Sequence, residues 1–228
     1  MNLPNKITLI RIILIPFFMA AFMLGYHFFA DWLVYLSAGI FVIASLTDFL
    51  DGQIARKRNM VTDMGKFLDP IADKVLVAAA LFLIIGYALI PAVFGVTFVA
   101  VIIAREFMVS ALRQVAATKG TVIAADKIGK WKTAVTMVAL TVILIARPLD
   151  VLFYGPSLLS TPFIAMDILP PLQTSSKFIY GIHLFHTFGA TQWVGFSLLA
   201  AAVLLTLISG IHYLIKNRGV FAEKNEKQ

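Results

Sequence analysis

Residues 48–73, DFLDGQIARKRNMVTDMGKFLDPIAD, decide how the rest of the chain is interpreted. They place Asp48, Asp51, Asp69 and Asp73 at the facing ends of two long apolar stretches that a short basic loop separates. Each stretch is long enough to cross the ~30 Å hydrocarbon core of a membrane as a helix. Carboxylates are costly in such segments and usually serve a function there. The sequence therefore predicts two antiparallel membrane helices with an acidic site at one end.

The composition of the whole chain also indicates a membrane protein. Of the 228 residues, 60% are hydrophobic and 14% are charged, and cysteine is absent. Soluble domains are about 45–50% apolar and about 25% charged, so an ordinary soluble domain, a disordered chain and a disulfide scaffold are excluded. We predict an all-α integral membrane protein with six transmembrane helices, at about residues 7–27, 32–54, 67–88, 91–116, 131–146 and 194–215.

The distribution of basic residues predicts the orientation of these helices. Short connections make neighbouring helices antiparallel, and one side of the membrane then holds all of the 19 lysines and arginines except Arg147 and Lys177. Because positively charged loops stay in the cytoplasm, both termini and the acidic site are expected at the cytoplasmic face. These loops account for the net charge of +7, so no nucleic-acid partner is expected.

The segment 148–192 differs from the rest of the chain. It is rich in proline, glycine and aromatic residues, and it forms an atypical non-cytoplasmic insertion, between spans five and six, within a single domain of residues 1–228. A connection of this length is uncommon without structure of its own. His183 and His186 could hold a metal together, although a pair at the membrane interface fits the aromatic surroundings better.

Helix geometry brings the four aspartates of residues 48–73 together. Asp48 and Asp51 are about 60° apart around a helix, and Asp69 and Asp73 about 40°, so each pair shares one face. Four carboxylates in one desolvated pocket repel one another, so either some are protonated or cations neutralise them. Oxygen ligands in this number suit Mg²⁺ or Mn²⁺, and a pair of such ions serves phosphoryl transfer. The alternative is a charged helix face exposed to the cytosol.

Small residues lie beside the first aspartate pair. Gly52 and Ala55 would let a ligand approach the backbone closely, although close packing of two helices needs small residues as well. Arg56 follows them, where its guanidinium can face a phosphate charge.

The stretch as a pattern is Asp48-x2-Asp51-Gly52-x2-Ala55-Arg56-x8-Gly65-x3-Asp69-x3-Asp73, and it resembles the signature of the CDP-alcohol phosphotransferase family. Within that family, the bacterial phosphatidylglycerophosphate synthases are similar to this chain at residues 2–11, Arg105-Glu106, Arg113 and residues 129–133. The resemblance covers residues 2–147 and, more loosely, the last predicted helix. It implies the family's fold, with the active site near the cytoplasmic face. The segment 148–192 departs from the family pattern.

The resemblance also implies a reaction. The phosphatidyl group of CDP-diacylglycerol would pass to sn-glycerol 3-phosphate, giving phosphatidylglycerophosphate and CMP. The metal ligands would be Asp48, Asp51, Asp69 and Asp73, holding two Mg²⁺ or Mn²⁺ ions, with Asp73 also as the general base. The CDP-lipid would contact Asn5, Thr8, Gly52, Ala55, Arg56 and Thr62. Family members commonly form homodimers, and the implied location is the bacterial inner membrane.

Basic residues of the fourth and fifth predicted helices would bind the phosphate of the acceptor: Arg105, Arg113, Lys130 and Lys132. Arginine within an apolar span normally faces a cavity or a partner. Arg105 could instead pair with a carboxylate such as Glu106, and the two lysines could anchor the fifth helix at the cytoplasmic face. A phosphorylated acceptor fits this basic set better than choline or ethanolamine, whose cationic groups need anionic or aromatic surroundings.

Three other functions compete with this interpretation. Another member of the family would use inositol phosphate, serine or phosphatidylglycerol as the acceptor. A cation transporter would also need carboxylates in the membrane, but it would place them nearer the midplane and often in repeated halves, and this chain has no internal repeat. A non-catalytic membrane scaffold would leave the four aspartates unexplained.

Overall fold

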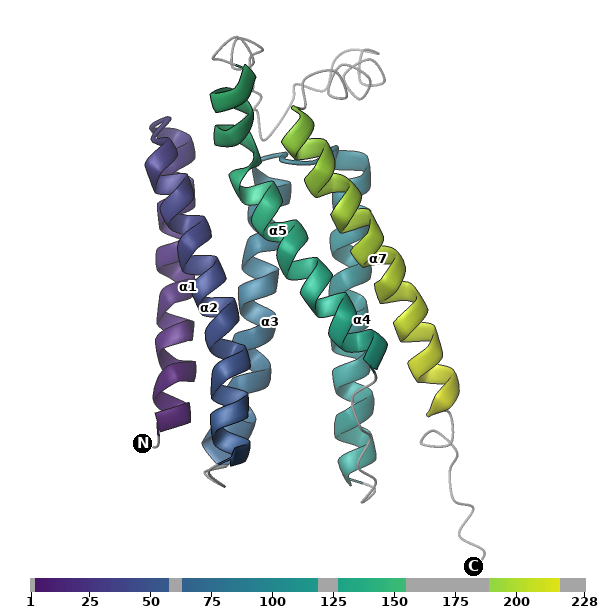
Figure 1. The fold of residues 1–228 in the computed structure, drawn as a ribbon. Coiled ribbons are helices and arrows are strands. Elements are labelled where there is room, and N and C mark those ends of the chain that lie inside the picture. Colours follow the sequence, from purple (N-terminus) through teal and green to yellow (C-terminus); the bar gives the residue numbers. More distant parts are fainter. Residues whose placement is uncertain (1–2, 58–62, 119–126, 155–188, 218–228) are drawn as a thin grey trace, which may run out of the picture.

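The computed structural model describes residues 3–57, 63–118, 127–154 and 189–217. This part of the chain forms six helices and no strand (Figure 1). They are α1 (Leu3–His27), α2 (Asp31–Lys57), α3 (Asp63–Gly86), α4 (Ala92–Thr118), α5 (Lys127–Tyr154) and α7 (Ala190–Lys216). The all-helical architecture predicted from the sequence is confirmed, and each helix covers one predicted span.

The helices form an up-and-down bundle in which successive helices run in opposite directions (Figure 1). Helix α1 packs against α2 and α3, while α5 packs against α7, α2 and α3. Helix α4 completes the bundle by packing against α3 and α7. The start of α1 and the end of α7 lie at the same end of the bundle (Figure 1), as the alternating topology requires.

Four helices of the described chain, α1, α4, α5 and α7, are long and apolar enough to cross a membrane. Helix α2 contributes a shorter apolar stretch, Asp31–Thr47. Large apolar side chains lie exposed on the helices, among them Phe17, Trp131 and Leu204. An exposed apolar surface of this extent is typical of contact with lipid, and helices suit lipid because they satisfy their own backbone hydrogen bonds. The chain is therefore a multi-pass membrane protein.

Side chains from most of the helices meet in one apolar core. Its fully buried members include Phe18 and Phe22 of α1, Phe41 of α2, Leu76 of α3 and Leu140 of α5. Because this core holds α3 and α5 at fixed positions, it also fixes the polar side chains that these helices carry at one end of the bundle.

Helix α5 is longer than the sequence predicts. The fifth span was expected to end at residue 146, before Pro148, but α5 runs through this proline to Tyr154. Proline removes one backbone hydrogen bond, and a membrane helix tolerates the loss where neighbouring helices pack against it. Helix α7 likewise begins at Ala190, so both edges of the predicted insertion 148–192 are helical. Residues 155–188, with His183, His186 and Lys177, lie outside the described residues.

Asp150 joins the end of α5 to the start of α7. Its fully buried carboxylate accepts hydrogen bonds from the backbone N–H groups of Thr191, at 2.9 Å, and Gln192, at 3.3 Å. The first N–H groups of a helix have no partner within the helix, so this carboxylate caps α7 and neutralises the positive end of its dipole. Gly189 makes the contact possible, because a Cβ atom there would lie 2.1 Å from Cγ of Asp150. We refer to this arrangement as the Asp150 cap.

Candidate active site

The acidic stretch lies at one end of two helices that pack against each other. Residues 48–57 end α2 and residues 63–73 begin α3, at the end of the bundle where α1 starts and α7 ends (Figure 1). Backbone positions therefore agree with the predicted meeting of the two aspartate pairs. The side chains of Asp48, Asp51 and Asp69 lie outside the described residues. Among the side chains that the structure does describe, no group of three or more potential metal ligands occurs.

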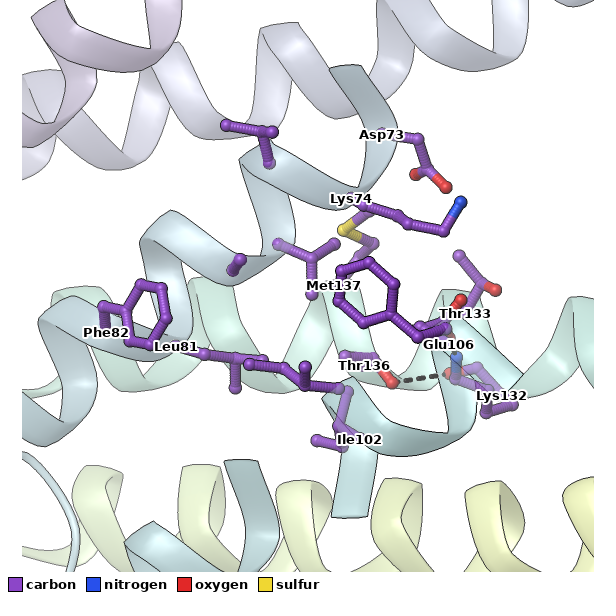
Figure 2. A pocket seen from close by; sticks show the side chains of 15 residues that line it. Asp73, Lys74, Leu81, Phe82, Ile102, Glu106, Lys132, Thr133, Thr136 and Met137 are labelled. Carbon is purple, nitrogen blue, oxygen red and sulfur yellow. Dashed lines mark hydrogen bonds and ion pairs between the residues drawn. The ribbon is translucent and has the colours of Figure 1, made fainter. Parts of the chain in front are cut away.

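The Asp73 side chain faces a cavity of about 220 Å³ between α3, α4 and α5 (Figure 2). One end of the cavity is apolar, with Leu81 and Phe82 of α3 and Ile102 of α4 on its wall (Figure 2). The other end is charged: Asp73 and Lys74 come from α3, Glu106 from α4, and Lys132 and Thr133 from α5. The structure thus brings the predicted base, Asp73, and one predicted phosphate-binding residue, Lys132, to the same cavity.

Lys132 is buried at the charged end of this cavity. Lys132 is only 3% exposed, and its ammonium forms an ion pair with Oε1 of Glu106. Nη1 of Arg105 lies 3.7 Å from the same oxygen atom. A buried ammonium needs an anion beside it, because losing its water without compensation is costly. The ion pair with Glu106 supplies that anion, so Lys132 does more than anchor α5 at the membrane surface.

Arg105 and Arg113 both turn toward α7. Nη2 of Arg105 donates a hydrogen bond to Oγ of Ser209 at 3.0 Å, and Nε of Arg113 donates one to the Tyr213 hydroxyl at 3.2 Å. Arg105 also meets Glu106, the pairing that the sequence left open. Arg113 lies farther along α4, with its guanidinium over the Tyr213 ring, and is not among the residues that line the cavity.

Close packing of α7 against α4 helps to place Arg105. A Cβ atom at Gly210 would lie 3.1 Å from Cγ of Arg105, so a side chain there would require the arginine to shift by a few tenths of an ångström. The Nε atom of Arg105 is buried and has no hydrogen-bond partner among the described residues. The guanidinium therefore lies beside the charged end of the cavity with one donor that the described protein does not use.

Few of the residues predicted to contact the CDP-lipid have described side chains. Thr62 lies outside the described residues, as do the side chains of Asn5, Gly52, Ala55 and Arg56, whose backbone belongs to α1 or α2. The side chain of Lys130, in the first turn of α5, also lies outside the described residues. Thr8 is described and fully buried on α1, one turn before Arg11.

The sequence profile of the CDP-alcohol phosphatidyltransferase family matches residues 1–169. The chain belongs to this family. The match includes α1 to α5 and thus the whole acidic stretch, the cavity and Lys132. The family predicted from the spacing of the aspartates is confirmed.

Individual members of the CDP-alcohol phosphatidyltransferase family are also similar to this chain. The CDP-diacylglycerol–glycerol-3-phosphate 3-phosphatidyltransferase of Bacillus subtilis is 46% identical over 156 residues, which cover 63% of this chain and 77% of the relative. Relatives with the same name from Pseudomonas fluorescens and Escherichia coli are 42% and 43% identical, and the chain covers 74% of each.

Two charged residues that line the cavity, Glu106 and Lys74, were not predicted as part of the site. Glu106 was noted only as part of the resemblance and as a partner for Arg105, yet it also pairs with Lys132. The signal for both was a charged residue within an apolar span, since such residues normally face a cavity or a partner.

Proposed function

We propose that this chain transfers the phosphatidyl group of CDP-diacylglycerol to sn-glycerol 3-phosphate, releasing phosphatidylglycerophosphate and CMP. The name shared by relatives at 42–46% identity supports this activity. The observation that carries it at the level of single residues is the cavity in which Asp73 and Lys132 lie together. A carboxylate able to accept a proton and an ammonium able to bind a phosphate are the groups that a phosphorylated alcohol needs.

The four aspartates fit a site for Mg²⁺ or Mn²⁺. Asp48, Asp51, Asp69 and Asp73 offer only carboxylate oxygens, and hard divalent ions prefer such ligands over the sulfur and imidazole ligands typical of zinc. The four aspartates would hold two ions, and these ions would neutralise the diphosphate of the donor lipid when bound. The placement of residues 48–57 and 63–73 at one end of two packed helices supports this assignment.

Asp73 is proposed as the general base of the transfer. A hydroxyl oxygen of the acceptor forms a bond to the phosphorus of the phosphatidyl group, and the bond from that phosphorus to the oxygen of CMP breaks. The hydroxyl proton passes to the Asp73 carboxylate, and CMP leaves with the electron pair of the broken bond. Positioning dominates such reactions, because phosphoryl transfer needs little covalent help from the protein.

The remaining site residues divide between the two substrates. Lys132 and Arg105, with Lys130 and Arg113 nearby in sequence, are proposed to bind the acceptor's phosphate through charge-assisted hydrogen bonds. Arg105 and Lys132 meet at one oxygen of Glu106, which supports their role as a pair. The proposed CDP-lipid contacts are Asn5, Thr8, Gly52, Ala55, Arg56 and Thr62.

The proposed setting is the bacterial cell membrane, with both termini and the charged end of the cavity at the cytoplasmic face. The location of the start of α1 and the end of α7 at one end of the bundle supports this orientation, and so does the excess of lysine and arginine expected there. We further propose one domain over residues 1–228 with an insertion near 148–192, and a homodimer on the basis of family resemblance.

One experiment tests the proposed activity. The purified chain is given CDP-diacylglycerol and, separately, sn-glycerol 3-phosphate, inositol phosphate, serine, phosphatidylglycerol or plain glycerol, and CMP release is measured. CMP release with sn-glycerol 3-phosphate, and little with plain glycerol, is the expected result. Preference for another acceptor would move the chain to another activity of its family. Cation flux without CMP release would instead favour a transporter.

A further inference from the structure

One oxygen atom of Glu106 lies near two cations, that of Lys132 in the cavity and that of Arg105 beside it. Oε1 of Glu106 forms the ion pair with Lys132 and lies 3.7 Å from Nη1 of Arg105. Glu106 and Lys132 line the charged end of the cavity together with Asp73 (Figure 2), and Arg105, which is not one of the lining residues, lies next to Glu106. An anion that is to bind both Lys132 and Arg105 needs the place that this oxygen occupies.

The burial of these side chains differs in a way that allows an exchange of anions. The Lys132 side chain is 4% exposed and that of Arg105 is 12% exposed, so both cations are held inside the protein. The Glu106 side chain is 25% exposed, which leaves its carboxylate room to turn away while Lys132 stays in place. Arg105 also has a buried Nε donor without a partner among the described residues.

We propose that Glu106 is an internal anion that fills the acceptor's phosphate position in the empty cavity and yields it only to a doubly charged phosphate monoester. The inference rests on the proposed function and makes Glu106 a residue that determines acceptor specificity. Coulomb attraction scales with the charge of the anion, so a dianion gains more from the two cations than the single carboxylate that it displaces. A singly charged anion gains no such surplus and must still expel Glu106. Exclusion of wrong ligands by a built-in competitor is a common route to specificity.

The first test uses the wild-type enzyme and two small anions. CMP release is measured at varied sn-glycerol 3-phosphate and saturating CDP-diacylglycerol, at pH 8, where the second ionisation of a phosphate monoester, with a pKa of about 6, is complete. Inorganic phosphate and the monoanion dimethyl phosphate are added at matched ionic strength. Inorganic phosphate should compete with the acceptor and dimethyl phosphate should not. Equal competition by both anions would overturn the proposal.

The second test removes the charge of Glu106. Glu106→Gln keeps the size of the side chain, so the KM for sn-glycerol 3-phosphate should fall roughly tenfold, equivalent to about 1.4 kcal/mol. Dimethyl phosphate should now compete, while the KM for CDP-diacylglycerol should stay near its wild-type value. A higher KM for the acceptor, with dimethyl phosphate still excluded, would show that Glu106 only positions Lys132 and would overturn the proposal.

Asp31→Asn serves as the matched control. Asp31 is exposed in the first turn of α2, at the end of the bundle opposite the start of α1, and its substitution removes the same unit of negative charge. KM and inhibition by both anions should match the wild type in this variant. If Glu106→Gln does not fold, the comparison of the two anions on the wild-type enzyme still tests the role proposed for Glu106. Absence of CMP release by the wild type with sn-glycerol 3-phosphate would refute the proposed function, whereas an active wild type that fails to distinguish the anions refutes only this inference.

Discussion

Replacing Lys132 by Gln should weaken acceptor binding more than any change at Arg113. Lys132 is 3% exposed and lines the cavity beside Asp73, so water cannot take over its role toward a bound phosphate. A charge-assisted hydrogen bond contributes about 1.5–3 kcal/mol, and its loss should raise the KM for sn-glycerol 3-phosphate roughly 10–150-fold. Arg113 is exposed and hydrogen-bonded to Tyr213, so Arg113→Gln should change this KM less than about threefold, which corresponds to under 0.7 kcal/mol.

The same substitution also tests how much the ion pair stabilises the fold. Glu106 would keep the guanidinium of Arg105 at 3.7 Å. Removing one partner of a fully buried pair costs about 3–5 kcal/mol, but Glu106 is 25% exposed and water can compensate part of this. We therefore expect a loss below about 3 kcal/mol, and a lower Tm of a chain that still folds.

The assay is CMP release at varied sn-glycerol 3-phosphate with CDP-diacylglycerol held at saturation, alongside thermal unfolding in detergent. The KM for CDP-diacylglycerol provides the internal control, since Lys132 is assigned to the acceptor alone. A larger effect at Arg113 than at Lys132, or a loss confined to the lipid substrate, would refute the assignment of the cavity to the acceptor.

Three further predictions concern the proton, the metal and the fold. Asp73→Asn keeps the size of the side chain but not its basicity, so kcat should fall about 10²–10⁴-fold while CDP-diacylglycerol still binds; a near-normal kcat would contradict the role of Asp73. Exhaustive treatment with EDTA should stop CMP release and added Mg²⁺ or Mn²⁺ should restore it, whereas full activity after chelation would exclude a metal role for the aspartates. Asp150→Asn should lower the free energy of unfolding by roughly 1.5–3 kcal/mol, because the amide nitrogen cannot accept one of the two charge-assisted hydrogen bonds from the start of α7. Thermal unfolding measures this loss, and the KM values should not change; an unaltered Tm would argue against the Asp150 cap.

Patterns within single helices were predictable from the sequence. Apolar stretches of sufficient length gave the six helices, and the aspartate spacing indicated both the family and the end of the bundle where the site lies. Both features are local: a helix is indicated by one continuous apolar stretch, and aspartates three or four residues apart share a face of that helix.

Contacts between helices were not predictable in the same way. Both arginines were assigned to the acceptor's phosphate, but a helix face does not reveal its neighbour, and both arginines, Arg105 and Arg113, meet α7. The ion pair of Glu106 with Lys132 joins α4 to α5, so no local pattern indicates it. The fifth span was placed at residues 131–146, whereas the packed helix α5 continues through Pro148 to Tyr154.

The Asp150 cap makes the connection between α5 and α7 a suitable place for added sequence. The chain leaves α5 at Tyr154 and returns at Gly189, and hydrogen bonds from Thr191 and Gln192 to Asp150 already tie these points together. Once the ends of a connection are held, each doubling of its length costs only about 0.6 kcal/mol in closure entropy. The connection also begins about 33 Å along α5 from Lys132, at a rise of 1.5 Å per residue. A reporter domain or an affinity handle joined there would leave the distances within the cavity unchanged.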